Sequence, residues 1–464
     1  MSNPSNTSEP SVGASLAMFG AVAMIMTQLH RQASSSEDLG QGAGHFFFDP
    51  EEEELEQFVQ SVPKIELHVH LDGSFDPYQL WSYLVKHPEL IHCFPVEKKM
   101  PWAKPDEPPI PLRQMVRECE NALAYRRLCT CRRRYRKYRQ QRRDTRQVTT
   151  NGKSKRGKSQ GTLEDMLNCF EFFLPLVYDN FVLLEELAFD FVRRQFEQNV
   201  IYTEVRYSPH LLSTKEPKKA FDAITKGLRR GCEQFSVTVN QILCAICFFP
   251  DWSKDIVTLA DEHRQDFPCA VVGIDIAAGE AHFMDDSPYR QGHYEMCRLA
   301  QELGLNITIH AGETPDSEQN VQTAIEKYGA RRIGHAYRIS SRQDILNLVR
   351  DKKIHIESCP TSSVETGGWQ KTEWKEHPAN RFRDYGISVS LSSDDPAVFN
   401  TSLTWQYRIA LKKMGWQKSD ILHMLEDAIQ ASFLDDDGKE KLRRQLQEWN
   451  VHDNPAFQDR VHYD

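Results

Sequence analysis

The residues with the clearest chemical potential in this sequence are histidines and acids that follow short apolar runs. His68 and His70 lie in segment 63–74, whose first half is β-branched and apolar enough to form a strand. Because side chains on a strand repeat every second residue, both imidazoles point to one side as a pair of metal ligands. Asp72 continues that side, and Gly73 follows where the chain must turn. Taken alone, a strand that merely carries two histidines explains this pattern equally well.

Two later residues can complete a metal site with this pair. His310 ends one apolar run, and Asp394 follows another. In a parallel βα barrel the carboxyl ends of all strands meet at one rim, so residues far apart in sequence converge there. Three imidazole nitrogens and one carboxylate oxygen form a ligand set suited to zinc, with a water molecule completing the coordination. The sequence therefore predicts a zinc site formed by His68, His70, His310 and Asp394.

Three more residues at the same rim can manage the protons that such chemistry needs. A divalent metal lowers the pKa of its bound water toward neutrality and makes it a nucleophile. Glu313, on the same turn as His310, can act as a general acid or base, while His335 and Asp395 can orient water and substrate. The last two also have simpler explanations: His335 as a satisfied core histidine, and Asp395 as the cap of a helix that starts at Pro396.

Strand-like runs alternate with helix-like segments in the part of the chain that must position these residues. One helix is predicted at 183–198, where apolar residues recur at helical spacing. This alternation predicts an α/β fold, a TIM (β/α)8 barrel, with an open doubly wound sheet as the alternative. The eight predicted strands are 65–71, 200–207, 241–249, 270–277, 307–310, 332–335, 354–358 and 387–392.

Composition and cysteine usage restrict the class of protein. Hydrophobic residues form 40% and charged residues 27% of the chain, and the net charge is -9, which is typical of a soluble enzyme and argues against a membrane protein. The cysteines are scattered without framework spacing, so we expect free thiols in a reducing, cytoplasmic environment. Segment 14–26 is apolar but too short to span a bilayer and lacks a basic start, so secretion is the alternative.

Two segments differ from the rest of the chain. Residues 1–58 are rich in Ser, Gly and Asn, so we expect a disordered N-terminal tail before a catalytic domain at 59–464. A basic insertion at 126–160 separates the first two strands, and within it residues 126–158 hold fifteen Lys or Arg and one acid. Such a block cannot pack in a core, so we predict an exposed, disordered excursion. It either is solvated without a partner or tethers nucleic acid or an acidic partner.

The motifs at these positions resemble those of adenosine deaminases, a family of the metal-dependent amidohydrolase superfamily. The resemblance covers the chain from about residue 64 to about residue 449, excluding the basic insertion. It implies a TIM barrel that binds one zinc ion per subunit and deaminates adenosine, and 2′-deoxyadenosine, to inosine and ammonia in purine nucleoside salvage or catabolism. The matching motifs are HVHLDG at 68–73, EVRYSPHLL at 204–212, HAGE at 310–313, RIGH at 332–335 and SLSSDDP at 390–396.

The resemblance also implies roles for individual residues. Water activated by the metal would attack purine C6 while Glu313 protonates N1 and His335 serves as a base or electrostatic anchor. Asp395 would contact purine N7, and Asp72 the ribose 5′-hydroxyl. The other implied contacts are the metal ligands His68, His70, His310 and Asp394, with His70 also beside the substrate, and an apolar lid formed by Met166, Leu167 and Phe170.

One position departs from the pattern of the family. After the fourth strand the family usually has Asp-Leu-Ala-Gly-x-Glu, whereas this chain has Asp-Ile-Ala-Ala-Gly-Glu at 275–280. Ala278 therefore stands at the glycine whose N–H would meet purine N3. Alanine keeps the N–H, but its methyl group needs a compatible backbone and room beside the base, so affinity could fall.

A deaminase of AMP or of an N6-substituted adenine nucleotide is the nearest alternative function. A phosphate group would need Arg or Lys near the position of Asp72, whose carboxylate would repel it. A barrel without catalysis, whose basic arm binds nucleic acid, is the alternative from another class of function. The intact set of metal ligands argues against that second alternative.

Overall fold

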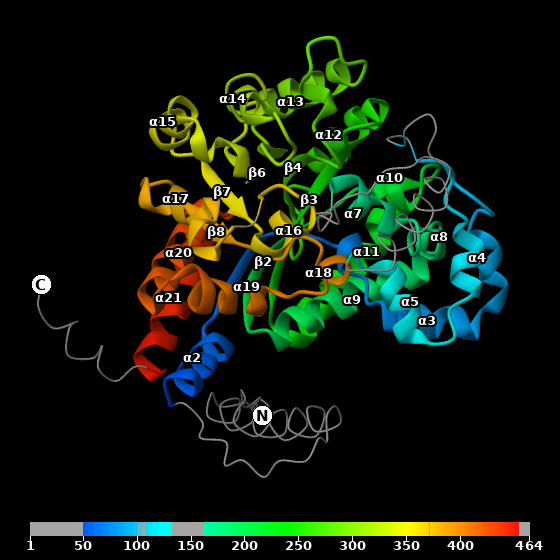
Figure 1. The fold of residues 1–464 in the computed structure, drawn as a ribbon, viewed down its shortest axis with the longest axis horizontal. Helices are drawn as coiled ribbons and strands as arrows, with labels where there is room; N and C mark the ends of the chain where they lie inside the picture. The colour runs from blue at the N-terminus through cyan, green and yellow to red at the C-terminus, as the bar shows by residue number, and fades with distance from the viewer. Residues whose placement is uncertain (1–49, 101–102, 104–107, 132–161, 371, 454–464) are drawn as a thin grey trace, which may run out of the picture. The chain divides into compact units, whose positions relative to one another are not determined.

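Parallel strands form the centre of the fold and follow one another in chain order (Figure 1). The computed structural model describes residues 50–100, 103, 108–131, 162–370 and 372–453. Within them, eight strands form one parallel sheet, and most strand residues are buried on both faces, as is usual for parallel sheets. The strands are β1 (Lys64–His70), β2 (Val200–Tyr207), β3 (Thr238–Ile246), β4 (Val271–Ala277), β5 (Asn306–Ala311), β6 (Arg332–His335), β7 (His355–Ser358) and β8 (Val389–Leu391).

The sheet closes on itself through a short contact between β1 and the residues after β8. The His70 N–H donates to the Asp394 carbonyl over 2.8 Å, and the Asp394 N–H donates to the His68 carbonyl over 3.1 Å. Val69 and Asp394 pair in parallel between these two bonds. The fold is therefore the predicted TIM barrel, and the open doubly wound sheet is wrong. The same contact brings Asp394 beside both histidines of β1.

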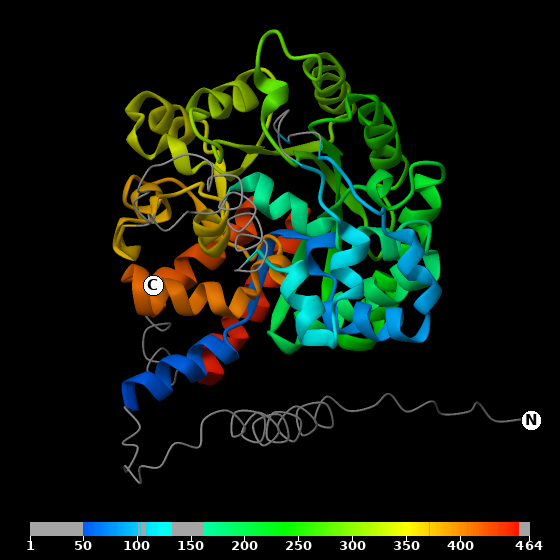
Figure 2. The ribbon, with the colours of Figure 1, turned by 45° about the vertical axis from the view of Figure 1, so that its right-hand side comes forward.

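Helices connect the strands and cover the outside of the barrel (Figure 2). In both views, α3, α4 and α5 lie at one side of the barrel, near α9. The helices are α2 (Pro50–Ser61), α3 (Pro77–Lys86), α4 (Leu112–Arg117), α5 (Ala122–Cys129), α7 (Leu163–Phe170), α8 (Leu174–Val177), α9 (Phe181–Glu197), α10 (Pro209–Leu212), α11 (Pro217–Phe235), α12 (Ser253–Glu262), α13 (Arg290–Leu303), α14 (Glu318–Glu326), α15 (Gln343–Asp351), α16 (Pro360–Glu365), α17 (Pro378–Asp384), α18 (Pro396–Phe399), α19 (Leu403–Ile409), α20 (Lys418–Ala431) and α21 (Asp436–Asp453).

The two long helices α9 and α11 pack closely against each other because of two glycines. A Cβ atom on Gly227 would lie 2.1 Å from the Glu185 carbonyl oxygen, and one on Gly231 would lie 2.6 Å from the Val192 Cβ. Any larger residue at either position would force the helices apart. This contact holds the wall of the barrel next to β2, the strand that carries part of the site described below.

The eight predicted strands all occur, with shifts at their ends. The largest shift is in β3, which we expected at 241–249 and which spans Thr238–Ile246. It begins earlier because Thr238 and Val239 pair with Tyr202 and Thr203 of β2. It ends earlier because the Phe249 N–H donates to the Ile246 carbonyl over 2.8 Å and closes a turn directly after the strand. The helix predicted at 183–198 is α9.

Helices occupy described parts of the expected tail and of the expected insertion. α2 begins at Pro50, inside the segment 1–58 that we expected to be disordered. Arg126 and Arg127, at the start of the expected insertion, belong to α5, whose buried Tyr125 and Leu128 anchor it to the core. Residues 1–49 and 132–161 lie outside the described residues. In the described part of the chain, no helix combines the length and apolar character that crossing a membrane requires.

Candidate active site

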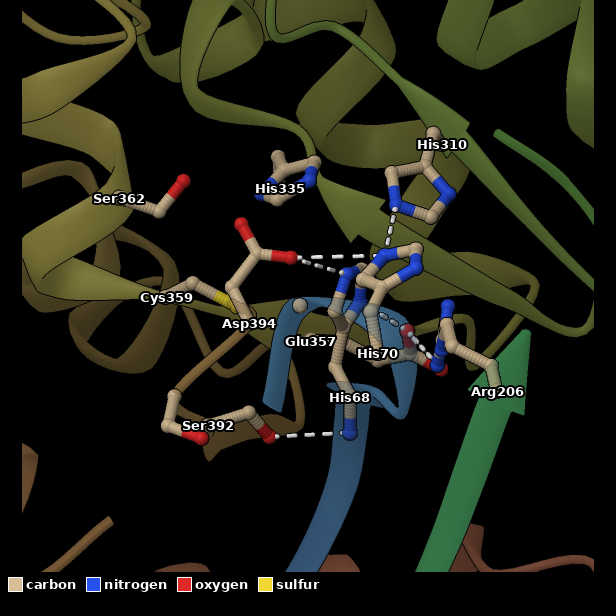
Figure 3. A network of polar contacts seen from close by, with 12 residues as sticks. His68, His70, Arg206, His310, His335, Glu357, Cys359, Ser362, Ser392 and Asp394 are labelled. Carbon is tan, nitrogen blue, oxygen red and sulfur yellow. Dashed lines mark hydrogen bonds and ion pairs between the residues drawn. The ribbon is translucent and has the colours of Figure 1, made fainter. Parts of the chain in front are cut away.

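The side chains expected as metal ligands meet at the carboxyl-terminal rim of the barrel (Figure 3). The Nε2 atoms of His70 and His310 lie 3.1 Å apart. The Asp394 Oδ1 atom lies 3.1 Å from His68 Nε2 and 3.5 Å from His70 Nε2. The barrel thus gathers donor atoms from β1, from β5 and from the loop after β8 around one point.

The separations and types of these donor atoms fit a divalent metal ion. Atoms bound tetrahedrally at about 2.0–2.2 Å from zinc lie roughly 3.3–3.6 Å from one another, close to the distances above. His68 Nε2 is buried and makes no hydrogen bond of suitable geometry with the described residues, so its lone pair is available. His335 also brings a donor atom within 4.8 Å of those of His68, His310 and Asp394. The site therefore offers one imidazole more than the four ligands that we expected.

Two buried acids contact the Nδ1 atoms of two candidate ligand histidines, and the sequence analysis missed both acids. Glu357 Oε2 lies 2.7 Å from His68 Nδ1, and Asp275 Oδ2 lies 2.9 Å from His310 Nδ1. A carboxylate at Nδ1 accepts the ring N–H there and leaves Nε2 as the ligand atom. Both acids lie on predicted strands with their side chains toward the barrel interior, and this is the signal that could have revealed them.

Glu313 lies beside the cluster in a loop that Glu280 holds in place. The N–H groups of Glu313 and Thr314 each donate to Glu280 Oε1 over 2.9 Å, and the Gly312 N–H donates to Oε2 over 2.8 Å. Burial, and next the charge of Asp394, raises the pKa of Glu313 to about 8. A carboxyl group with this pKa is largely protonated at neutral pH, as a proton donor must be.

Thr366 and His335 contact Glu313 from two sides. The Thr366 hydroxyl donates to Glu313 Oε1 over 2.8 Å, and His335 Nε2 lies 3.7 Å from Glu313 Oε2. His335 Nδ1 lies 3.3 Å from the Tyr337 hydroxyl. Burial lowers the pKa of His335 well below its usual range, so the imidazole is neutral. A neutral His335 can accept a proton at the nitrogen that faces Glu313.

Asp395 has a buried oxygen without a partner. Its Oδ1 atom makes no hydrogen bond among the described residues. Burial, and next the charge of Asp394, raises the pKa of Asp395 well above its ordinary value. Gly73 packs so closely that a Cβ atom there would lie 1.8 Å from Asp395 Oδ1. Because a buried polar atom without a partner costs free energy, Asp395 is a strong candidate for a contact with substrate.

A cavity of about 700 Å³ opens onto these residues. Its walls include every substrate contact that the sequence analysis expected: His70, Asp72, Met166, Leu167, Phe170, Ala278 and Asp395. Met166, Leu167 and Phe170 come from α7 and form part of an apolar wall. Burial raises the pKa of Asp72 to about 6. The cavity is within the usual size range for a small-molecule site.

Three residues around the cavity have a left-handed backbone, which side chains other than glycine rarely adopt. Ala278 has a φ of 71°, His335 of 72° and Asp394 of 64°. Such conformations cost about 1–3 kcal/mol each and are typical of functional sites. The alanine that departs from the family pattern is thus accommodated, but in a conformation that glycine adopts at lower cost.

Comparison with known proteins agrees with this geometry. The family model described as adenosine deaminase matches residues 146–449. The chain belongs to the adenosine deaminase family. Adenosine deaminase of Clostridium perfringens (strain SM101 / Type A) is 33% identical over 387 residues, which cover 82% of this chain and 97% of that protein. Adenosine deaminase of Xenopus tropicalis is 28% identical over 408 residues, covering 85% of this chain and 97% of that protein.

A solved structure extends the comparison to the fold. The apo structure of the N6-methyl-AMP deaminase from Arabidopsis thaliana has a TM-score of 0.61 and 21% identity, and the match covers 85% of this chain and 98% of that chain. Members of the adenosine deaminase family are metal-dependent hydrolases. This chain is accordingly an enzyme that deaminates adenosine-like substrates, and its His/Asp cluster is the candidate metal site.

Proposed function

We propose that this enzyme is a zinc-dependent deaminase that hydrolyses adenosine and 2′-deoxyadenosine to the corresponding inosine nucleosides and ammonia. One observation carries the proposal: a single cavity is lined by His70, His310 and Asp394 and also by Glu313, whose pKa burial raises to about 8. The cluster can hold a Lewis acid, and the carboxyl group can supply a proton at neutral pH. Hydrolytic deamination of a purine needs these two functions at C6 and N1.

The proposed metal ligands are His68, His70, His310 and Asp394, which would hold one zinc ion per chain. When bound, zinc lowers the pKa of a coordinated water and so supplies a nucleophile for C6 at neutral pH. The imidazole-rich donor set supports zinc over calcium and magnesium, because those cations prefer oxygen atoms.

Proton transfer in this proposal depends on Glu313 and His335. Protonated Glu313 donates to purine N1, which opens C6 to attack. Neutral His335, with its Nε2 atom 3.7 Å from Glu313 Oε2, accepts a proton from the attacking water. Return of that proton to the C6 amine releases ammonia, and the proton of the C6 hydroxyl passes to the Glu313 carboxylate as the carbonyl of inosine forms.

The remaining proposed contacts orient the nucleoside. The raised pKa of Asp395 supports a protonated carboxyl group that donates to purine N7, which is an acceptor. The Ala278 N–H would meet N3, and Asp72 would accept a hydrogen bond from the ribose 5′-hydroxyl. Apolar side chains from α7, namely Met166, Leu167 and Phe170, would cover the base and exclude water.

A nucleotide substrate is the second candidate, because two lysines line the same cavity. Lys98 and Lys99 belong to its walls, although Lys98 Nζ lies 2.7 Å from Glu171 Oε1. The structural neighbour named as an N6-methyl-AMP deaminase also supports this candidate. Against it, Asp72 has a pKa of about 6 and is therefore largely ionised at pH 7, where it would repel a 5′-phosphate.

The two candidates are distinguished by the rates at which the purified zinc-loaded protein releases ammonia from adenosine and AMP, and methylamine from N6-methyl-AMP. We expect kcat/KM to be at least about tenfold higher for adenosine than for AMP. Asp72→Asn should lower kcat/KM for adenosine and so reduce the ratio of kcat/KM for adenosine to kcat/KM for AMP. Lys98→Met is the matched control, because it should leave adenosine turnover unchanged. Preference of the wild-type protein for AMP would overturn the nucleoside assignment.

Two further proposals concern location and the basic insertion. A cytoplasmic location is supported by buried free thiols such as those of Cys244, Cys247 and Cys359. Binding of nucleic acid or an acidic partner by the insertion at 126–160 stays a prediction. A gel-shift assay that compares the full chain with a variant lacking residues 132–160 tests it.

A further inference from the structure

Arg206 lies in the EVRYSPHLL motif, and the proposed function assigns it no role. It belongs to β2, and its fully buried guanidinium lies next to the His/Asp cluster (Figure 3). Its Nη1 donates to Asp275 Oδ2 over 2.9 Å, and its Nη2 donates to Glu357 Oε2 over 2.7 Å and to the Leu67 carbonyl over 2.6 Å. Arginine is almost never fully buried unless it has such partners.

The acids that Arg206 binds are the same two that hold the ligand histidines. Glu357 Oε2 contacts His68 Nδ1 over 2.7 Å, and Asp275 Oδ2 contacts His310 Nδ1 over 2.9 Å. One guanidinium group therefore braces the carboxylates behind ligands from β1 and β5. Rotation of either carboxylate would turn the Nε2 atom of its histidine away from the common point.

A second buried arginine offers a natural comparison. Arg332 Nε lies 2.7 Å from Glu357 Oε1, and its Nη1 lies 2.6 Å from Glu204 Oε2. Glu357 Oε1 also accepts a hydrogen bond from the Thr308 hydroxyl over 2.9 Å. Glu357 is thus held at both oxygens, whereas within the described chain Asp275 pairs with no arginine other than Arg206.

We propose that Arg206 is a positioning residue that sets the metal affinity of the site. It fixes the orientation of His310 through Asp275 and, to a smaller extent, that of His68 through Glu357. The inference rests on the proposed metal site and adds a residue that touches neither metal nor substrate.

The shape of the arginine side chain, as well as its charge, matters for this role. The guanidinium is a planar fork whose N–H groups have fixed directions, and here they bridge two carboxylates and one carbonyl. The ammonium group of lysine keeps the charge but lacks this fork. Arg206→Lys therefore separates the effect of geometry from the effect of charge.

The test is the affinity of the metal-free full-length protein for Zn²⁺. Competition with a chromophoric chelator measures this affinity without relying on enzyme activity. Arg332→Gln is the matched control, because it also removes a buried guanidinium from between two acids, and circular dichroism monitors folding. We expect Arg206→Gln to bind Zn²⁺ about 10–100-fold more weakly than wild type, and Arg332→Gln less than about threefold more weakly. If Arg206→Gln does not fold, Arg206→Lys carries the test, with an expected loss of about tenfold.

Adding Asp275→Asn to each protein tests whether Arg206 affects Zn²⁺ binding through Asp275. It should weaken Zn²⁺ binding strongly in the wild-type and Arg332→Gln proteins but little in Arg206→Gln, where Asp275 has already lost its brace.

Three results would each overturn the inference. The first is a Zn²⁺ affinity equal to that of the wild type in Arg206→Gln or, if that variant does not fold, in Arg206→Lys; the second is an equal loss of Zn²⁺ affinity in Arg206→Gln and Arg332→Gln. The third is a loss of affinity on adding Asp275→Asn to Arg206→Gln that is as large as in the wild-type protein. Failure of the wild-type protein to bind Zn²⁺ would instead overturn the proposed function.

Discussion

Two buried polar residues at opposite ends of the barrel, Lys64 and Asp395, differ in how their polar atoms are satisfied. At the amino-terminal end, Lys64 is buried, and its Nζ donates to the carbonyls of Val62 and Gln198 over 3.0 and 2.8 Å. At the carboxyl-terminal rim, Asp395 is just as buried, but its Oδ1 atom has no hydrogen-bond partner among the described residues. Backbone carbonyls satisfy the Lys64 Nζ atom internally, whereas Asp395 leaves an oxygen for a ligand to satisfy.

This difference separates a residue that stabilises the fold from one that we propose contacts the substrate. At the rim, the Asp395 Oδ1 atom, which has no hydrogen-bond partner in the described part of the chain, lies near the left-handed backbones of Ala278, His335 and Asp394. Backbone strain of this kind persists only where the surrounding packing and hydrogen bonds hold the residue in place. Substitutions at the rim should therefore change activity more than stability, and substitutions at the amino-terminal end should do the reverse.

The largest expected effect at the rim is the loss of turnover in Glu313→Gln. Glutamine cannot donate the carboxyl proton, so kcat should fall about 10²–10⁴-fold while zinc content and the free energy of unfolding stay near wild type. Ammonia release and metal analysis on the same sample measure both quantities. His310→Ala is the contrasting variant and should lose zinc as well. Near-normal turnover in Glu313→Gln would remove the proton donor from this account.

At the opposite end, Lys64→Met should reverse this pattern. Methionine fills a similar volume but leaves the Val62 and Gln198 carbonyls without their donor, so the free energy of unfolding should fall by about 1–3 kcal/mol. The kcat of the folded enzyme should stay the same. Urea unfolding and steady-state kinetics at one pH measure the two effects. A reduced kcat with an unchanged free energy of unfolding would show that Lys64 serves activity instead of stability, contrary to this account.

A smaller effect at the rim is a shift of the pH profile in Thr366→Val. Burial raises the pKa of Glu313 to about 8, so activity should decline as pH rises through about 8 and the carboxyl group loses its proton. The Thr366 hydroxyl donates to Glu313 and favours the charged form, so its removal should raise the pKa of Glu313 and move the decline upward by about one pH unit. Profiles of kcat/KM against pH test this shift, and a downward shift would contradict it.

The smallest expected effect is a gain of stability in Ala278→Gly. Glycine adopts a φ of 71° without the steric cost of a Cβ atom, so the free energy of unfolding should rise by about 0.5 kcal/mol. The KM for adenosine should fall if the methyl group restricts the base. Urea unfolding and substrate kinetics give both values. Loss of stability in this variant would mean that the left-handed backbone of Ala278 carries no strain.

The sequence was sufficient to predict where the candidate metal ligands gather, because their signals are local. His68 and His70 alternate along one strand, and His310 and Asp394 each follow another predicted strand. The rule that parallel barrel strands share a carboxyl-terminal rim then predicts their convergence. The observed contact between β1 and the residues after β8 agrees with that rule.

The roles of other residues could not be predicted because they depend on partners from distant strands. Asp275 and Glu357 are ordinary acids on strands until the barrel brings them against His310 and His68. Arg206 acquires a role only through both acids together, and strand register cannot be read from one sequence. The start of α2 was missed for a different reason: its acidic first turn is also typical of a solvated tail.

Ammonia release from adenosine before and after metal removal tests the central claim most directly. The purified protein should contain about one zinc ion per chain. It should lose its activity on dialysis against a chelator and regain that activity when zinc alone is added. Full activity of the metal-free protein would contradict the account, because His68, His70, His310 and Asp394 would then have gathered at one point without serving the reaction.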